Sequence, residues 1–223
     1  MTVSVLVPWR PGCEYRERAF QFMRNRIARA HPSWELVVGE CAPGPFNRSA
    51  AILDAAGKAS PDADVYVVHD ADVFLEGDLA ESVEAARSSG WAVPHKMLHR
   101  LADDASAAVL AGVDWRGLPV AQKPYRGNEA GTLIVLTRDV LDLVSPDRRF
   151  VGWGQEDDAW ALALRCLIGE PTRGSDDLVH LWHPPQERLN RRIGNQAGKA
   201  LLSRYRRAAS NPDAMRALIE EAA

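Results

Sequence analysis

The sequence is poor in cysteine and has no long hydrophobic run. Its three cysteines, Cys13, Cys41 and Cys166, lie far apart and form no Cys-x-x-Cys pair, which argues against a disulfide framework and a structural zinc site. It contains no window of about 18 apolar residues, the length needed to span a bilayer. The first residues have neither the basic lead nor the apolar stretch of a secretory signal. We therefore expect a protein of the reducing cytoplasm.

An excess of charge of either sign is also lacking. The formal net charge is -3 over 223 residues, with 26% charged and 46% hydrophobic residues. Because there is no global positive excess, a nucleic-acid partner is not expected. The apolar fraction is ample for a core, so the length and composition indicate one α/β domain with at most a short appendage.

The first half of the chain alternates between strand and helix patterns. Apolar, β-branched runs predict strands, and apolar residues at helical spacing predict helices. The predicted strands are 2–7, 34–38 and 65–68, and the predicted helices are 14–30, 48–58 and 78–88. Strands separated by helices favour parallel pairing through right-handed crossovers.

The second half is less regular. A short strand at 91–94 precedes residues 95–126, whose periodicity is weak. Beyond it the patterns predict strands at 131–137 and 178–182 and helices at 138–144 and 156–167. The chain from residue 188 onward reads as polar helix, and Asn211-Pro212 is a suitable cap and first-turn pair for a last helix.

An acidic pair, Asp70-Ala71-Asp72, directly follows the third predicted strand. Ligands of open parallel sheets bind beyond the carboxyl ends of the strands. One carboxylate could face a ribose while the other binds a hard divalent cation such as Mg2+ or Mn2+. The alternative is an acidic turn that only caps the strand.

The segment from Gly152 to Asp158 reads Gly-Trp-Gly-Gln-Glu-Asp-Asp. The glycines permit a tight loop, and Trp153 offers a flat face for a sugar ring. Acids in a first helical turn complement the helix dipole, but three exceed that need. We interpret one of them as a general base for a hydroxyl nucleophile.

Two histidines, His180 and His183, close the last predicted strand. They could bind one metal if the chain bends there, although in a regular strand they would face opposite sides. Histidine ligands favour Mn2+ over Mg2+. His183 is the stronger candidate because it lies nearer the end of the strand.

In this order, the segments resemble the GT-A glycosyltransferases, and above all the beta-1,4-galactosyltransferase family and related bacterial polysaccharide transferases. The matching pieces are Val7-Pro8-Trp9-Arg10, Phe46-Asn47-Arg48, Asp70-Ala71-Asp72, residues 131–137, the Gly-Trp-Gly-x-Glu-Asp-Asp segment and His180-x-x-His183. The resemblance implies an α/β GT-A (nucleotide-diphospho-sugar transferase) fold with a mixed, mostly parallel central sheet flanked by helices. It implies a catalytic domain over 1–187, followed by a helical basic extension over 188–223 packed on or beside it.

The resemblance also implies a reaction and its site. A hexose or N-acetylhexosamine would pass from a UDP-sugar donor to a hydroxyl of a carbohydrate or glycoconjugate acceptor, with inversion and with Mn2+ (or Mg2+). Asp157 would be the base, and Asp72, His183 and His180 the metal ligands, although the family has methionine at the position of His180. Donor contacts would come from Pro8, Trp9, Arg10, Phe46, Arg48, Asp70, Ala71 and Trp153. Acceptor contacts would come from Trp153, Gly154, Glu156 and Asp158.

The sequence departs from the family pattern in places. Ala159 stands where members often carry a fourth acid, and 123–129 matches the family's mobile donor-covering loop poorly. The family's usual N-terminal membrane anchor is not found, which suggests a bacterial or phage-like enzyme.

Other interpretations remain open. Asp70 and Asp72 also fit the nucleophile loop of a haloacid-dehalogenase-like phosphohydrolase, although that loop should follow the first core strand. A sugar nucleotidyltransferase would need a Gly-rich loop after the first strand, and a non-catalytic carbohydrate-binding relative would not need the acids and histidines together. The basic tail is a solvated helix or a weak contact for an anionic surface. Its basic residues are Arg188, Arg191, Arg192, Lys199, Arg204, Arg206 and Arg207.

Overall fold

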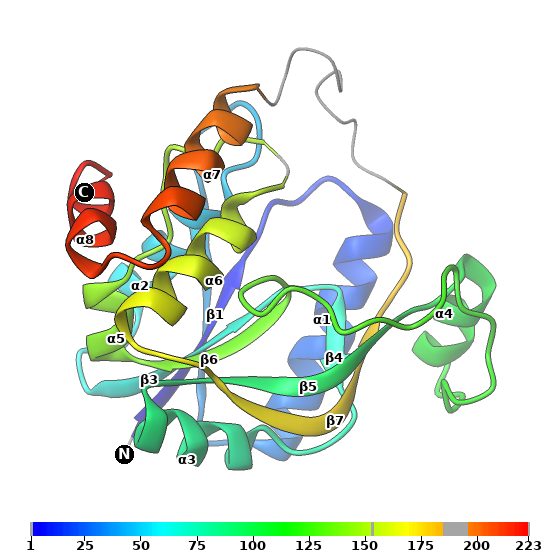
Figure 1. The fold of residues 1–223 in the computed structure, drawn as a ribbon. Coiled ribbons are helices and arrows are strands. Elements are labelled where there is room, and N and C mark those ends of the chain that lie inside the picture. Colours follow the sequence, from blue (N-terminus) through cyan, green and yellow to red (C-terminus); the bar gives the residue numbers. More distant parts are fainter. Residues whose placement is uncertain (1, 153, 185–195, 223) are drawn as a thin grey trace.

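The computed structural model describes residues 2–152, 154–184 and 196–222. Within them the chain forms one mixed sheet with strand order β2-β1-β3-β6-β5-β7-β4 and helices on both of its faces (Figure 1). The predicted α/β class and the mixed sheet flanked by helices are confirmed. In the described part of the chain, no helix is both long and apolar enough to cross a membrane.

The N-terminal half follows the predicted alternation closely. Strand β1 pairs in parallel with both β2 and β3. Helix α2 is capped by Asn47, whose side chain accepts a hydrogen bond from the backbone N–H of Ala50, as its residue type favours. The elements are β1 (Thr2–Pro8), α1 (Glu14–Ala30), β2 (Glu35–Gly39), α2 (Arg48–Lys58), β3 (Ala63–His69) and α3 (Leu79–Ser89).

The C-terminal half adds antiparallel strands. Strand β6 runs antiparallel between β3 and β5, while β5 and β7 are parallel and β4 is antiparallel to β7. The elements are β4 (Val73–Leu75), β5 (Trp91–Arg100), α4 (Asp103–Leu110), β6 (Leu133–Thr137), α5 (Arg138–Leu143), α6 (Glu156–Leu167) and β7 (Thr172–His180). The sequence patterns missed β4 and α4, and they ended β5 six residues early.

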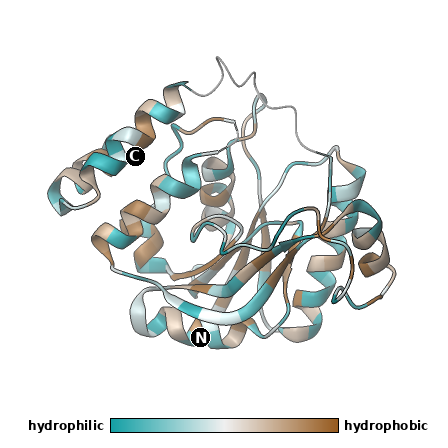
Figure 2. Ribbon diagram, turned by 45° about the vertical axis from the view of Figure 1, so that its right-hand side comes forward, coloured by the Kyte–Doolittle hydropathy of each residue, from teal (hydrophilic) through white to brown (hydrophobic). Residues whose placement is uncertain are grey.

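The sheet is buried on both faces. Along β3, Tyr66 and Val68 belong to a core shared with α2, α5 and α6, whereas Val65 and Val67 belong to a core shared with α1 and α3. This alternation follows from the two-residue repeat of a strand. Figure 2 shows the resulting concentration of hydrophobic residues in the central strands.

The last two helices, α7 (Gln196–Ala208) and α8 (Pro212–Glu220), pack on α6 (Figure 1). Their buried residues, including Tyr205 and Met215, join the core that contains Trp160 of α6. Pro212 occupies the first turn of α8 and Asn211 caps it, as predicted. The predicted boundary at 187/188, with Arg188, Arg191 and Arg192, lies outside the described residues.

Candidate functional site

The carboxyl ends of β1, β2 and β3 lie at one edge of the sheet because these strands are parallel. The segments that follow them are therefore neighbours. They carry Arg10 after β1, the loop of residues 40–47 after β2, and Asp70 to Asp72 after β3. This edge is where an open parallel sheet binds ligands.

Strand pairing brings Asp72 to His180. In the antiparallel β4–β7 ladder, Val73 lies opposite His180, and the N–H of Leu181 donates to the carbonyl of Asp72 at 2.8 Å. The Nε2 atom of His180 is 3.7 Å from Oδ1 of Asp72. The two side chains meet because a three-residue strand, invisible in the sequence pattern, pairs with the end of β7.

His183 joins the same carboxylate. Strand β7 ends at His180, so the alternation that would have separated the two histidines does not continue. The Nε2 atom of His183 lies 3.2 Å from Oδ2 of Asp72, and the ring centroids of the two histidines are 5.3 Å apart. The backbone N–H of Trp182, between them, donates to the Ser106 hydroxyl at 2.7 Å and anchors the turn.

These three residues form a candidate metal centre. One ligand atom from each lies within 4.8 Å of the others, and a carboxylate with two imidazoles suits a transition-metal ion. The Nδ1 atom of His183 is 2.8 Å from the carbonyl of Pro184. Because that oxygen can only accept, Nδ1 carries the proton and Nε2 presents its lone pair to the site. The residues present therefore fit a divalent cation.

Burial and charge shift the ionisation of this cluster. Burial lowers the pKa of His180 to about 4, although Asp72 opposes that effect, so the imidazole is neutral and able to ligate near neutral pH. Burial alone would raise the pKa of Asp72, but His180 and His183 in their protonated forms, together with the permanent charge of Arg16, lower it below its usual value. The carboxylate is thus held in the charged form that a metal requires.

A second polar cluster adjoins the first through Ala71. The Nε atom of Arg48 donates to Oδ1 of Asp70 at 3.0 Å, and Nη1 donates to the carbonyl of Ala130 at 3.2 Å. Arg48 is buried, and its Nη2 has no hydrogen-bond partner among the described residues. Burial raises the pKa of Asp70, while Arg48 opposes the shift.

The three acids of the first turn of α6 differ in environment. Glu156 is partly buried, and its buried Oε2 atom also has no partner in the described part of the chain. Burial and the neighbouring Asp157 raise its pKa to about 7, against the effect of Arg48. Asp158 accepts a hydrogen bond from the side-chain amide of Asn128. Asp157 faces the backbone of Gly131, since a Cβ atom on that glycine would lie 3.5 Å from Oδ2 of Asp157.

The loop before α6 requires unusual backbone conformations. Gly154 has φ 95° and Gln155 has φ 77°, the left-handed region that glycine adopts most easily. The N–H of Gly152 donates to the carbonyl of Phe46 at 3.0 Å, which ties this loop to the segment before α2. Trp153, predicted to contact both sugars, lies outside the described residues.

The remaining predicted donor residues divide into two groups. The guanidinium of Arg10 lies 5.3 Å over the ring of Phe46 and donates to the carbonyl of Ala42 and to Sγ of Cys41, so this loop and Arg10 form one wall. Pro8 ends β1 at the same edge. Trp9 instead stacks on Phe20 of α1 at 4.9 Å and lines a cavity of about 770 Å³ between α1 and α4.

Sequence reasoning missed Arg16 and Asn128. Arg16 of α1 lies beside Asp72 and His183. It stands in the helical register of the buried residues Phe20 and Met23, so an arginine in line with an apolar stripe was the available signal. Nothing in the sequence around Asn128 indicated its contact with Asp158.

Comparison with known proteins gives likeness in structure only. No family model matches the chain, and no curated protein matches it either. The catalytic domain of Drosophila beta1,4galactosyltransferase 7, in complex with xylobiose, is similar with a TM-score of 0.58 and 18% identity, covering 91% of this chain and 79% of that one.

Two further solved structures are similar. A mutant of the same Drosophila enzyme in complex with manganese, UDP-Gal and xylobiose has a TM-score of 0.55 and 18% identity, over 90% of this chain and 79% of that chain. Glucosyl-3-phosphoglycerate synthase from Mycobacterium tuberculosis has a TM-score of 0.49 and 12% identity, over 94% and 80% of the two chains. The likeness to the two Drosophila structures shows that the chain has the fold of the GT-A nucleotide-sugar transferases.

Proposed function

We propose that this protein is a metal-dependent glycosyltransferase that moves a hexose or N-acetylhexosamine from a UDP-sugar to an acceptor hydroxyl. The observation that carries the proposal is the convergence of Asp72, His180 and His183 beside Asp70 and Arg48, at the ligand-binding edge of a GT-A fold. The Drosophila enzyme of the same fold, in complex with manganese, UDP-Gal and xylobiose, supports this choice of chemistry.

In the proposed reaction, the chain must stabilise a leaving nucleotide diphosphate and remove a proton from the acceptor. Asp72, His183 and His180 would hold Mn2+ or Mg2+, which when bound neutralises negative charge on the departing phosphates. Arg48 brings a permanent positive charge to the same edge of the sheet, and its free Nη2 can donate to the donor substrate. Arg10 and Phe46 would form the wall against the nucleotide.

The acceptor side would be formed by the start of α6. Asp157 is the proposed general base, because its Oδ2 lies close to Gly131, while Asp158 is engaged by Asn128. Glu156, whose buried Oε2 has no partner among the residues that the structure describes, would hold a sugar hydroxyl. Gly154 leaves room beside them for a ring. Removal of the proton as the hydroxyl attacks is general base catalysis, and inversion would follow from a single displacement.

A phosphohydrolase using Asp70 as nucleophile is not favoured. Its second aspartate should serve as a free acid and base, whereas Asp72 lies against two imidazoles. Oδ1 of Asp70 is bonded to Arg48 at 3.0 Å, which occupies one of the two carboxylate oxygens that could attack phosphorus.

The decisive experiment compares Asp157→Asn with wild type in a screen of UDP-sugars, with UDP release as the readout and Mn2+ present or chelated. We expect Mn2+-dependent release in the wild type and a loss of at least about 100-fold in Asp157→Asn, the contribution of a general base. UDP binding with Mn2+ should be unchanged.

Asp213→Asn is the matched control. Asp213 also lies in the first turn of a helix, α8, but its side chain is 96% exposed and pairs with Arg216. This variant should keep wild-type turnover. Full activity of the chelated wild type would refute the metal centre, and wild-type turnover in Asp157→Asn would refute the assignment of the base.

A further inference from the structure

One arginine shares the proposed metal centre with its ligands. Nε of Arg16 lies 3.5 Å from Oδ2 of Asp72, and its Nη2 lies 3.3 Å from Nε2 of His183. The Arg16 side chain is 22% exposed, and its buried Nε makes no hydrogen bond within the described residues. The guanidinium therefore faces the site, but the described residues do not use all of its hydrogen-bond donors.

Arg16 contacts the same atoms that a cation would use. Nδ1 of His183 donates to the carbonyl of Pro184, so its Nε2 carries the lone pair, which accepts from Arg16. The nearest carboxylate oxygen of Asp72 is the one that also faces His183. A guanidinium has donors only and keeps its charge. It can therefore replace an ion at these two atoms but cannot be a ligand to it.

A metal ion and this guanidinium cannot hold these atoms together. Like charges a few ångströms apart repel strongly in a poorly solvated site, so Arg16 must withdraw when an ion binds. Helix α1 is anchored by the buried residues Phe20, Met23 and Ile27, which keeps the base of the Arg16 side chain at the site. Its planar fork matches phosphate oxygens, and a donor held by the ion would bring a diphosphate to the same place.

We propose that Arg16 is a resident cation of the metal centre: it holds Asp72 and His183 together before the ion binds, and then moves onto the diphosphate of the donor. The inference rests on the proposed function, because it requires both a divalent ion and a nucleoside diphosphate. It makes Arg16 oppose the ion when no nucleotide is present and support the nucleotide when the ion is bound.

Arg16 should thus weaken the binding of the ion and strengthen the binding of the nucleotide, and a merely structural residue would not have these opposite effects. Arg16→Gln removes the charge and keeps a polar side chain of similar reach. In calorimetric titration without nucleotide, we expect it to bind Mn2+ about tenfold more tightly than wild type, since one repelling charge is lost. At saturating Mn2+ it should bind UDP about tenfold more weakly, the effect of one charge-assisted phosphate contact. Uridine binding should not change.

Two further variants complete the test. Arg16→Lys keeps the charge and should bind Mn2+ with nearly wild-type affinity. Arg18→Gln is the matched control, because Arg18 lies on the same helix but is 53% exposed and pairs with Glu14, and it should match wild type in both titrations. Thermal melting of each variant shows that it is folded.

The inference is overturned if folded Arg16→Gln binds Mn2+ no more tightly than wild type, or if it binds UDP equally well at saturating Mn2+. A wild-type protein that binds neither Mn2+ nor UDP would instead refute the proposed function itself. The two failures are therefore distinguishable.

Discussion

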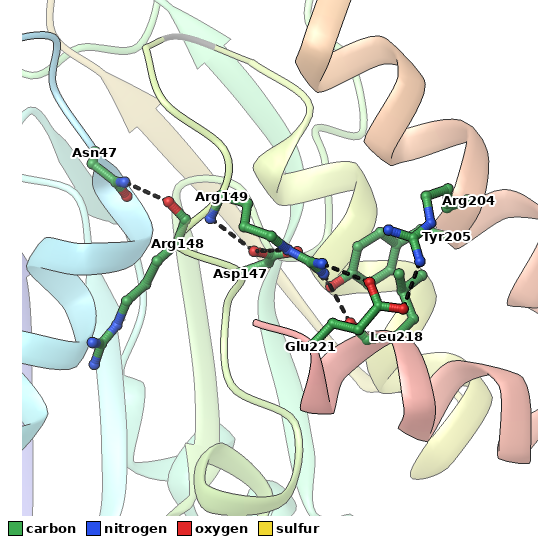
Figure 3. A network of polar contacts seen from close by, with 8 residues as sticks. All are labelled: Asn47, Asp147, Arg148, Arg149, Arg204, Tyr205, Leu218 and Glu221. Atoms are coloured by element: carbon green, nitrogen blue, oxygen red, sulfur yellow. Dashed lines mark hydrogen bonds and ion pairs between the residues drawn. The ribbon is translucent and has the colours of Figure 1, made fainter. Parts of the chain in front are cut away.

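The molecule has two buried aspartates with arginine neighbours, and they differ in how completely they are bonded. Asp147, between α5 and α6, is 5% exposed. It accepts hydrogen bonds from Nε and Nη2 of Arg149 at 3.0 and 2.8 Å and from the hydroxyl of Tyr205 at 2.9 Å (Figure 3). Asp72 is 8% exposed, but its basic neighbours lie at 3.2 to 3.7 Å.

The surroundings extend this difference. Arg149 also reaches Glu221 and the carbonyl of Leu218, and no buried side-chain nitrogen or oxygen of Asp147, Arg149 or Tyr205 lacks a partner in the described part of the chain. Beside Asp72 and Asp70, by contrast, Arg16, Arg48 and Glu156 each keep a buried atom for which the described residues offer no partner. Buried polar groups that are left unsatisfied are costly. The Asp147 network thus holds α7 and α8 in place, and the incomplete bonding around Asp72 agrees with the ligand site that we propose there.

The largest expected difference between the two is in activity. Asp72→Asn replaces a charged ligand by a neutral amide, so transition-state stabilisation by the ion should largely be lost. We expect turnover to fall by about a thousandfold or more, equivalent to several kcal/mol, while the protein stays folded. Turnover and calorimetric Mn2+ affinity measure this directly. Near-normal Mn2+ affinity in the variant would place the ion elsewhere.

The corresponding change at Asp147 should act on stability. Asp147→Ala leaves Arg149 beside an empty buried site, and breaking one partner of a buried pair costs about 3–5 kcal/mol. Urea unfolding should show that loss, whereas turnover per folded molecule should stay within about twofold of wild type. The control, Arg204→Ala, removes the solvent-screened pair with Glu221 and should leave the free energy of unfolding close to that of wild type. A thousandfold loss of turnover in Asp147→Ala would erase the distinction between the two regions.

Sequence patterns correctly predicted those elements whose structure depends on their own residues. The helix at 14–30 has its buried face at Phe20, Met23 and Ile27, as the 3.6-residue period predicts. The caps Asn47 and Asn211 are also local chemistry. The sequence patterns did not predict the rest of β5, beyond residue 94. This strand is defined by its pairing with β7, which lies some 80 residues away along the chain. Burial along the second half of β5 does not alternate regularly, so the sequence shows no two-residue period there that would indicate a strand.

The residues of the candidate site also divide into those that the sequence could indicate and those that it could not. Residue type and position at a strand end were enough to propose Asp72 and His183, and the structure brings the two side chains together. The sequence could not decide whether His180 joins them, because that depends on where β7 ends. The role of Arg16 could not be assigned for a related reason: its place in line with an apolar stripe was a signal, but its partners come from segments far away in the chain. Trp9 was assigned to the donor by motif alone, whereas its ring stacks on Phe20.

The smallest expected effect tests whether the incompletely bonded region around Asp70, Asp72 and Glu156 lowers the stability of the folded protein. The pKa of Glu156 is about 7 in the folded protein, against a usual value of 4.5. The folded state therefore keeps a proton that the unfolded chain releases, so stability falls as pH rises from about 4.5 to 7 and then levels off.

Glu156→Gln removes the titratable carboxyl group. It should match wild type near pH 4 and exceed it near pH 8 by at most about 3 kcal/mol, as measured by urea unfolding at both pH values. An equal effect of Glu156→Gln at both would show that burial of this carboxyl costs nothing, and the contrast with the fully bonded Asp147 would then rest on geometry alone.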